Sequence, residues 1–151
     1  MKITPPAPDA VEMLRLPARA GIYACSEESA RALFHAGPNA GFNAYRIDLN
    51  LALDETKLHH VLSRALHFPE WYGHNWDALA DCLTDMSWNE ADGYVILMQR
   101  AEVFANADPA GFSTLLGILR DTVAFWRDQG QSFWVLFIGD IPELGRLEVH
   151  T

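Results

Sequence analysis

The chain has 151 residues, half of them apolar, and 20 acidic against 11 basic side chains give a formal net charge of −9. This length and composition predict one domain with a core that needs neither disulfides nor a metal ion to be stable. The negative charge argues against direct binding to nucleic acid or an anionic membrane, and no segment approaches the about 20 apolar residues of a membrane-spanning helix.

The N-terminal region is punctuated by proline, which predicts a loose arm over residues 1–20. It has one lysine and no apolar run of the kind found in signal sequences, so export is not indicated. Cys25 and Cys82 have apolar neighbours in sequence, and reduced thiols in the cytoplasm are the simplest account of them. We expect a single α/β domain over residues 21–151.

In the first half of that domain, residues 21–25 (GIYAC) predict an extra N-terminal strand, and Ser26 is a suitable cap for the helix that follows. Alternation of apolar and polar side chains over residues 45–50 predicts a strand at the margin of a sheet. Asp54 caps a helix that ends before Pro69. Its apolar side chains recur at helical spacing: Leu58, Val61, Leu62, Ala65 and Leu66.

In the second half, residues 94–98 and 133–138 are apolar on both faces, which is typical of central strands in a parallel sheet. Asp108 and Pro109 begin the helix between them, and Trp126 and Trp134 belong to the core. The prediction is a small parallel sheet of three core strands plus the N-terminal one, flanked by helices. Weak alternation after Asp140 leaves a further strand open.

One segment of the chain is strongly acidic. Between Arg64 and Arg100 there is no lysine or arginine, but there are six carboxylates and four large aromatic side chains: Glu70, Asp77, Asp81, Asp85, Glu90, Asp92, Trp71, Tyr72, Trp76 and Trp88. A focused negative field with exposed rings favours a cationic protein as partner. A simply solvated acidic surface is the alternative.

The centre of this segment predicts a helix from Trp76 to Asp85 with Asn75 as its cap and a turn at Gly73. Apolar spacing places one side of the helix in the core, with Cys82 as an inert thiol beside it. Three aspartates form an outward row at i, i+4 and i+8: Asp77, Asp81 and Asp85. Like charges at this spacing destabilise a helix by a few tenths of a kcal/mol per pair, roughly, which suggests a purpose outside the chain.

The segment PEWYGHNWDAL at residues 69–79, followed by DCLT at 81–84, resembles the signature of the barstar family, the intracellular inhibitors of barnase-type ribonucleases. The resemblance covers about residues 44–139, including the order of helices and strands. It implies a small parallel α/β fold, no chemistry of its own, and a cytoplasmic inhibitor that blocks the active site of a basic secreted ribonuclease or a nuclease toxin. The carboxylates would stand in for RNA phosphates.

The resemblance also assigns roles by position. Asp81 matches the central carboxylate of the family, Trp71 an aromatic ring that stacks on the catalytic histidine of the nuclease, and Asp121 a further carboxylate on the last helix. The expected partner-binding residues are Trp71, Gly73, His74, Asn75, Trp76, Asp77, Asp81 and Asp121. The spacing of Trp76 also allows a core role. We expect Trp71 to point outward and Tyr72 inward.

Some positions depart from the family pattern. Ala80 stands where an aromatic is usual, Asp85 and Met86 replace a glycine and a tryptophan, and His74 replaces an acidic residue. These changes leave the identity of the nuclease open. A protein-interaction module that kept the fold without inhibiting a nuclease is therefore an alternative.

A metal-dependent hydrolase is a further alternative, because His74, Asp77 and Asp81 fall at i, i+3 and i+7. The chain has no GxSxG, no P-loop and no Cys-x-x-Cys, so we expect no enzyme, no cofactor and no metal. The remaining histidines are expected at the surface or at helix ends: His35, His59, His60, His67 and His150.

Overall fold

The computed structural model describes residues 8–149, so the first part of the expected arm and His150 lie outside it. Five parallel strands form one sheet in the order β2-β3-β4-β1-β5. The strands are β1 (Ile22–Cys25), β2 (Asn43–Asp48), β3 (Gly93–Gln99), β4 (Ser132–Ile138) and β5 (Gly145–Leu147). The expected α/β fold with a parallel sheet is thus confirmed, including the N-terminal strand.

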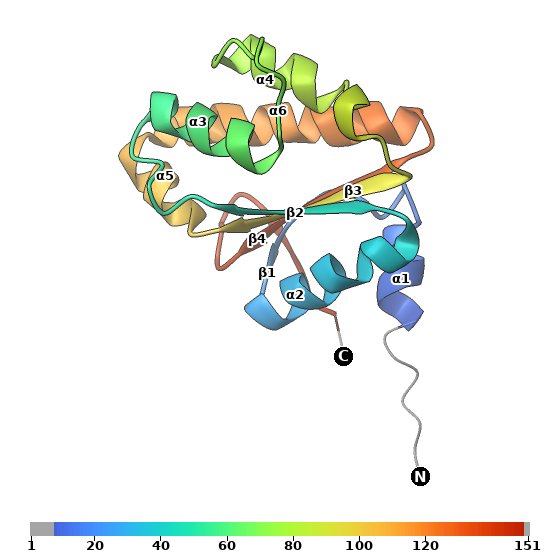
Figure 1. Cartoon of the computed structure of the whole chain (residues 1–151). Coiled ribbons are helices and arrows are strands. Elements are labelled where there is room, and N and C mark those ends of the chain that lie inside the picture. Colours follow the sequence, from blue (N-terminus) through green and yellow to red (C-terminus); the bar gives the residue numbers. More distant parts are fainter. Residues whose placement is uncertain (1–7, 150–151) are drawn as a thin grey trace.

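Helices cover both faces of this sheet (Figure 1). The helices are α1 (Pro8–Leu14), α2 (Glu27–Ala36), α3 (Glu55–Ala65), α4 (Trp76–Leu83), α5 (Ala101–Ala107) and α6 (Pro109–Asp128), with 3-10 turns η1 (Pro38–Ala40) and η2 (Ser87–Asn89). In Figure 1, α3, α4 and α6 lie on one face, and α1 and α2 lie on the other. None of the described helices is both long enough and apolar enough to cross a membrane.

The position of each strand follows from its sequence. In β3 and β4 the first six residues are buried, as expected for strands covered on both faces. Strand β2 alternates between buried and exposed residues over its second half and lies at the edge of the sheet. Capping follows the sequence as well, since Ser26, Asp54 and Asp108 each accept a hydrogen bond from the first turn of a helix.

The expectation of a loose N-terminal arm is wrong from Pro8 onward. This part of the chain forms α1, whose Leu14 is fully buried. Trp134 Nε1 donates a hydrogen bond to Leu14 O (3.0 Å), and Arg127 Nη2 donates one to Ala20 O (2.8 Å). The arm is held because apolar side chains of α1 complete the core on the α2 face of the sheet.

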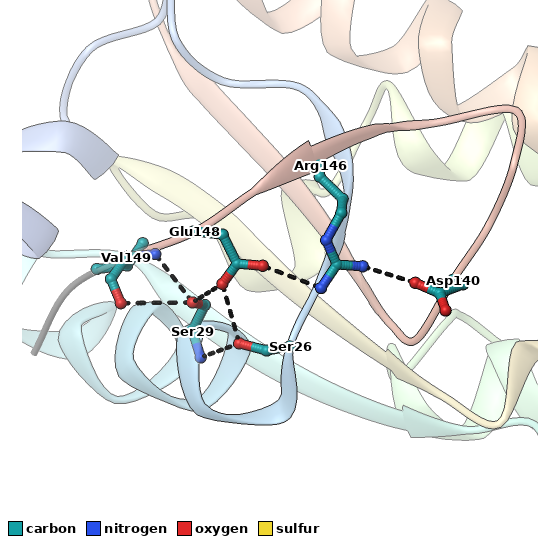
Figure 2. Close-up of polar contacts among 6 residues, drawn as sticks. All are labelled: Ser26, Ser29, Asp140, Arg146, Glu148 and Val149. Atoms are coloured by element: carbon teal, nitrogen blue, oxygen red, sulfur yellow. Dashed lines mark hydrogen bonds and ion pairs between the residues drawn. The ribbon is translucent and has the colours of Figure 1, made fainter.

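The C-terminal segment adds β5 beside β1, a strand that the sequence left open. Arg146 on β5 bridges Asp140 (2.8 Å) and Glu148 (2.9 Å). The Glu148 carboxylate accepts hydrogen bonds from the Ser29 hydroxyl (3.1 Å) and the Ser26 hydroxyl (3.3 Å), as Figure 2 shows. An acidic side chain at the N-terminus of α2 is favourable, so these contacts join the C-terminal segment to that helix.

Candidate functional site

The acidic row lies on α4, which is fixed at both ends. Asn75 Oδ1 accepts a hydrogen bond from Ala78 N–H (2.8 Å), so Asn75 is the cap that the sequence indicated. At the other end, Trp126 Nε1 of α6 donates a hydrogen bond to Leu83 O (2.8 Å). This bond satisfies a carbonyl that the helix itself leaves unpaired, and it holds α4 against α6.

Helix α4 is two residues shorter than predicted. It ends at Leu83, because the N–H groups of Asp85 and Met86 both bond to Cys82 O and Met86 adopts a left-handed backbone with φ 53°. Asp85 therefore follows the helix and does not extend its row of carboxylates.

The remaining carboxylates on α4 form no ion pair with any residue that the structure describes. Asp77 and Asp81 are exposed and lie one turn apart on the same face. Within residues 8–149, none of the six carboxylates of the acidic segment forms an ion pair; the arginine pairs lie elsewhere, at Glu27, Asp48, Asp140 and Glu148. The negative charge of this face is thus left to solvent or to a partner.

The opposite side of α4 belongs to the core. Leu79, Cys82 and Leu83 are buried, and Trp76 is half-buried with its ring centroid 4.9 Å from that of His59. Burial raises the pKa of the Cys82 thiol to about 11, with a smaller contribution from Asp85. A thiol of this kind is almost fully protonated at neutral pH, so Cys82 is a packing residue, as expected.

Residues 67–75 connect α3 to α4. They carry two adjacent aromatic residues, one exposed to solvent and one buried in the core. Trp71 is 65% exposed, whereas Tyr72 is 4% exposed and packs against Phe68, with ring centroids 4.8 Å apart. The predicted orientations of Trp71 and Tyr72 are both confirmed. Burial raises the pKa of Tyr72, whose hydroxyl shares a hydrogen bond with His59 Nδ1.

The prediction of a surface position for His59 is wrong. Its side chain is fully buried between Tyr72 and Trp76, its Nε2 lies 3.5 Å from Glu55 Oε2, and burial lowers its pKa. The sequence contained a signal for this, because His59, Leu62 and Leu66 fall at i, i+3 and i+7 on one side of α3. His59 supports the loop before α4 through its hydrogen bond with Tyr72. It is a supporting residue of the site that the sequence analysis missed.

The turn before α4 is built by His74 and not by Gly73. His74 has φ 54°, whereas Gly73 is not among the residues with positive φ. His74 Nδ1 donates a hydrogen bond to Tyr72 O (3.0 Å), which stabilises this conformation. At Gly73 a Cβ would lie 3.3 Å from Asn75 Nδ2 and 3.4 Å from Ala78 Cβ, so a larger residue there would press lightly on the side chain that caps α4.

Asp121 is exposed on α6, a position separate from the acidic helix. The alternative of a metal-dependent hydrolase would need His74 to converge with Asp77 and Asp81 on one site. His74 bonds to the loop and not to these aspartates. Between residues 8 and 149 no three histidine, cysteine, aspartate or glutamate side chains are placed to hold a metal ion.

The exposed residues of this region lie on α4 and on the loop before it. An exposed ring, two unpaired carboxylates and a capped helix suit contact with a positively charged protein face. The fold is a parallel α/β sheet that carries this acidic face on one of its helices.

Comparison with known families identifies which domain this is. The family described as Barstar (barnase inhibitor) matches residues 42–138, and the chain therefore belongs to that family. Its members inhibit barnase-type ribonucleases and are not enzymes. The matched region holds β2, β3, β4 and α3 to α6, whereas α1, β1, α2 and β5 lie outside it. The comparison with curated proteins found no match for this chain.

Proposed function

We propose that this chain inhibits a basic secreted ribonuclease or a nuclease toxin by placing α4 in the active-site cleft of that enzyme. The observation that carries the proposal is the pair Asp77 and Asp81, which is exposed on a capped helix and has no cation partner in the described chain. A cleft that holds RNA phosphates presents several cations, and two carboxylates one helical turn apart can occupy the positions of phosphate oxygens.

In this proposal each residue of the surface has a separate role. Asp81, in the middle of the exposed face, enters deepest among the cations of the nuclease, and Asp77 contacts the rim. Trp71 stacks on an imidazole of the nuclease, for which its 65% exposure leaves room. Gly73 and Asn75 shape the backbone that approaches the enzyme. Asp121, on the neighbouring helix, is a second and more distant point of contact.

Half-buried Trp76 supports α4 from below, and the buried pair of Tyr72 and His59 supports the loop that carries Trp71. A surface held in this way loses little conformational freedom on binding, which favours high affinity. We place the complex in the cytoplasm, where an inhibitor would protect the cell from its own nuclease or from an incoming one.

Titration calorimetry against a panel of barnase-type ribonucleases and nuclease toxins tests this function. We expect at least one dissociation constant of about nanomolar or below, and a large loss in Asp81→Asn. Glu12→Gln is the matched control, because it removes one exposed carboxylate on the opposite face of the sheet. Absence of heat with every nuclease at micromolar concentration, or equal losses in both variants, would contradict the proposal.

A further inference from the structure

A groove of about 610 Å³ opens beside the acidic face, between α3 and the loop that leads to α4. Its polar lining contains three histidines and one arginine against a single carboxylate: His60, Arg64, His67, Glu70 and His74. Phe68 and Tyr72 add aromatic surface to the lining. Arg64 is exposed and has no ion pair with any described residue. With neutral histidines the charges of Arg64 and Glu70 cancel, so the groove lacks the net negative charge of the row of aspartates on α4 and becomes positive only when its histidines are protonated.

The backbone holds two of these histidines in unusual conformations. His67 has φ 56° and His74 has φ 54°, so both are left-handed, although neither is a glycine. Such positions cost about 1 kcal/mol each and are concentrated at functional sites. The ring of His74 is also fixed, by its bond to Tyr72 O (3.0 Å) and by edge-on contact with His60, whose ring centroid is 5.2 Å away.

The hydrogen bond of His74 determines what the groove can bind. A carbonyl oxygen only accepts, so His74 Nδ1 carries the proton and a neutral ring presents a lone pair at Nε2. A second proton turns Nε2 into a donor, and the groove then offers charged donors to an anion. The other charged or titratable groups around His74 are His60, Arg64, His67 and Glu70. Buried His59 and partly exposed Glu55 lie behind Tyr72.

We propose that this groove binds a carboxylate side chain from the rim of the nuclease, and that this contact selects among nucleases. The proposal rests on the function proposed above. Trp71 is exposed and is adjacent in sequence to Glu70 and Tyr72, two residues that line the groove, so an enzyme that contacts Trp71 comes close to the groove. Complementary charge beside a common active-site contact gives specificity, because a nuclease without an acidic rim residue gains nothing there.

The first experiment needs no nuclease. The isolated protein is titrated with a capped tetraglutamate peptide at about pH 6 and about pH 8, and histidine ring signals are followed by NMR. We expect shifts of His60, His67 and His74 at the lower pH, weaker shifts at the higher pH, and no shift of exposed His35 on α2. Absence of shifts at the three groove histidines at millimolar peptide would overturn the proposal.

The second experiment uses each nuclease that binds the wild-type chain. The double variant His60→Gln with His67→Asn should weaken binding to nucleases with an acidic rim by roughly three- to tenfold at the lower pH, and by less at the higher pH. Asparagine tolerates the left-handed backbone of position 67, and His35→Gln is the control.

Equal affinities of wild type and double variant at both pH values would overturn the proposal, while loss of binding in Asp81→Asn would still support the inhibitor function. If no nuclease binds the wild type, the inhibitor function is contradicted. The peptide titration then tests by itself whether the groove binds carboxylates.

Discussion

Trp71 and Tyr72 are adjacent in sequence, but the fold gives them different energetic roles. Tyr72→Phe removes the hydroxyl that satisfies buried His59 Nδ1, and we expect the free energy of unfolding to fall by about 1 kcal/mol or more. Trp71→Ala truncates a ring that is 65% exposed and should change stability by no more than about 0.5 kcal/mol. Urea denaturation of both variants measures this, and a larger loss in Trp71→Ala would contradict the structure.

His59 makes stability depend on pH in a predictable direction. Its pKa is lowered from the ordinary 6.5, first by burial, so the unfolded chain takes up a proton more readily than the folded chain. The contribution of neutral His59 is therefore complete above pH 6.5 and is lost as the pH falls below that value.

His59→Gln can still bond to the Tyr72 hydroxyl but does not titrate. Denaturation of wild type and His59→Gln at about pH 7.5 and about pH 5.5 should show a smaller loss of stability in the variant on acidification. An identical loss in both proteins would mean that His59 does not titrate differently in the folded chain.

For single residues, the sequence predicted whether a side chain is exposed or buried where this follows from the local pattern. Exposed Asp77 and Asp81 and buried Tyr72 are examples. It failed for His59, because a histidine in an apolar stripe was judged by its polarity and not by its spacing. It also failed for the turn, since the left-handed residue is His74 although a glycine stands beside it. Here the Nδ1 bond to Tyr72 O stabilises a conformation that residue type alone disfavours.

Among the elements, α4 depends strongly on its cap because it has only eight residues. Asn75→Ala removes the acceptor for Ala78 N–H, and we expect a loss of about 1 kcal/mol in the free energy of unfolding. Asn75→Asp keeps an acceptor and should stay within a few tenths of a kcal/mol, roughly, of wild type. The urea midpoints of the two variants measure this difference. Identical midpoints would show that the cap does not limit the stability of α4.

The long, strongly patterned elements were predictable, since β3, β4 and α6 carry continuous or periodic apolar residues. Helix α1 was missed because its region contains several prolines, although Pro8 stands at the first helical position, where proline is compatible with a helix. What fixes α1 is the burial of Leu14 in the core on the α2 face of the sheet and the hydrogen bond from Trp134 to its carbonyl, which no local pattern reveals. Strand β5 spans only three residues, so the weak alternation after Asp140 was too short to decide for a strand.

For the whole molecule, the net charge of −9 and its concentration around α4 should govern the rate of association. Ions screen charges over about 8–10 Å at physiological salt, so steering towards a basic nuclease weakens as salt is added. Stopped-flow measurements should show an association rate constant that falls steeply with salt, and a dissociation rate constant that changes less. An association rate independent of salt would exclude steering by this face.

The most direct test of the central claim is steady-state inhibition of RNA cleavage by a nuclease that binds this chain. If the carboxylates of α4 occupy the phosphate positions, inhibition is competitive with RNA, and Asp81→Asn raises the inhibition constant by at least about 100-fold while Glu12→Gln leaves it unchanged. Inhibition that RNA cannot relieve, or that survives Asp81→Asn, would show that α4 does not block the active site.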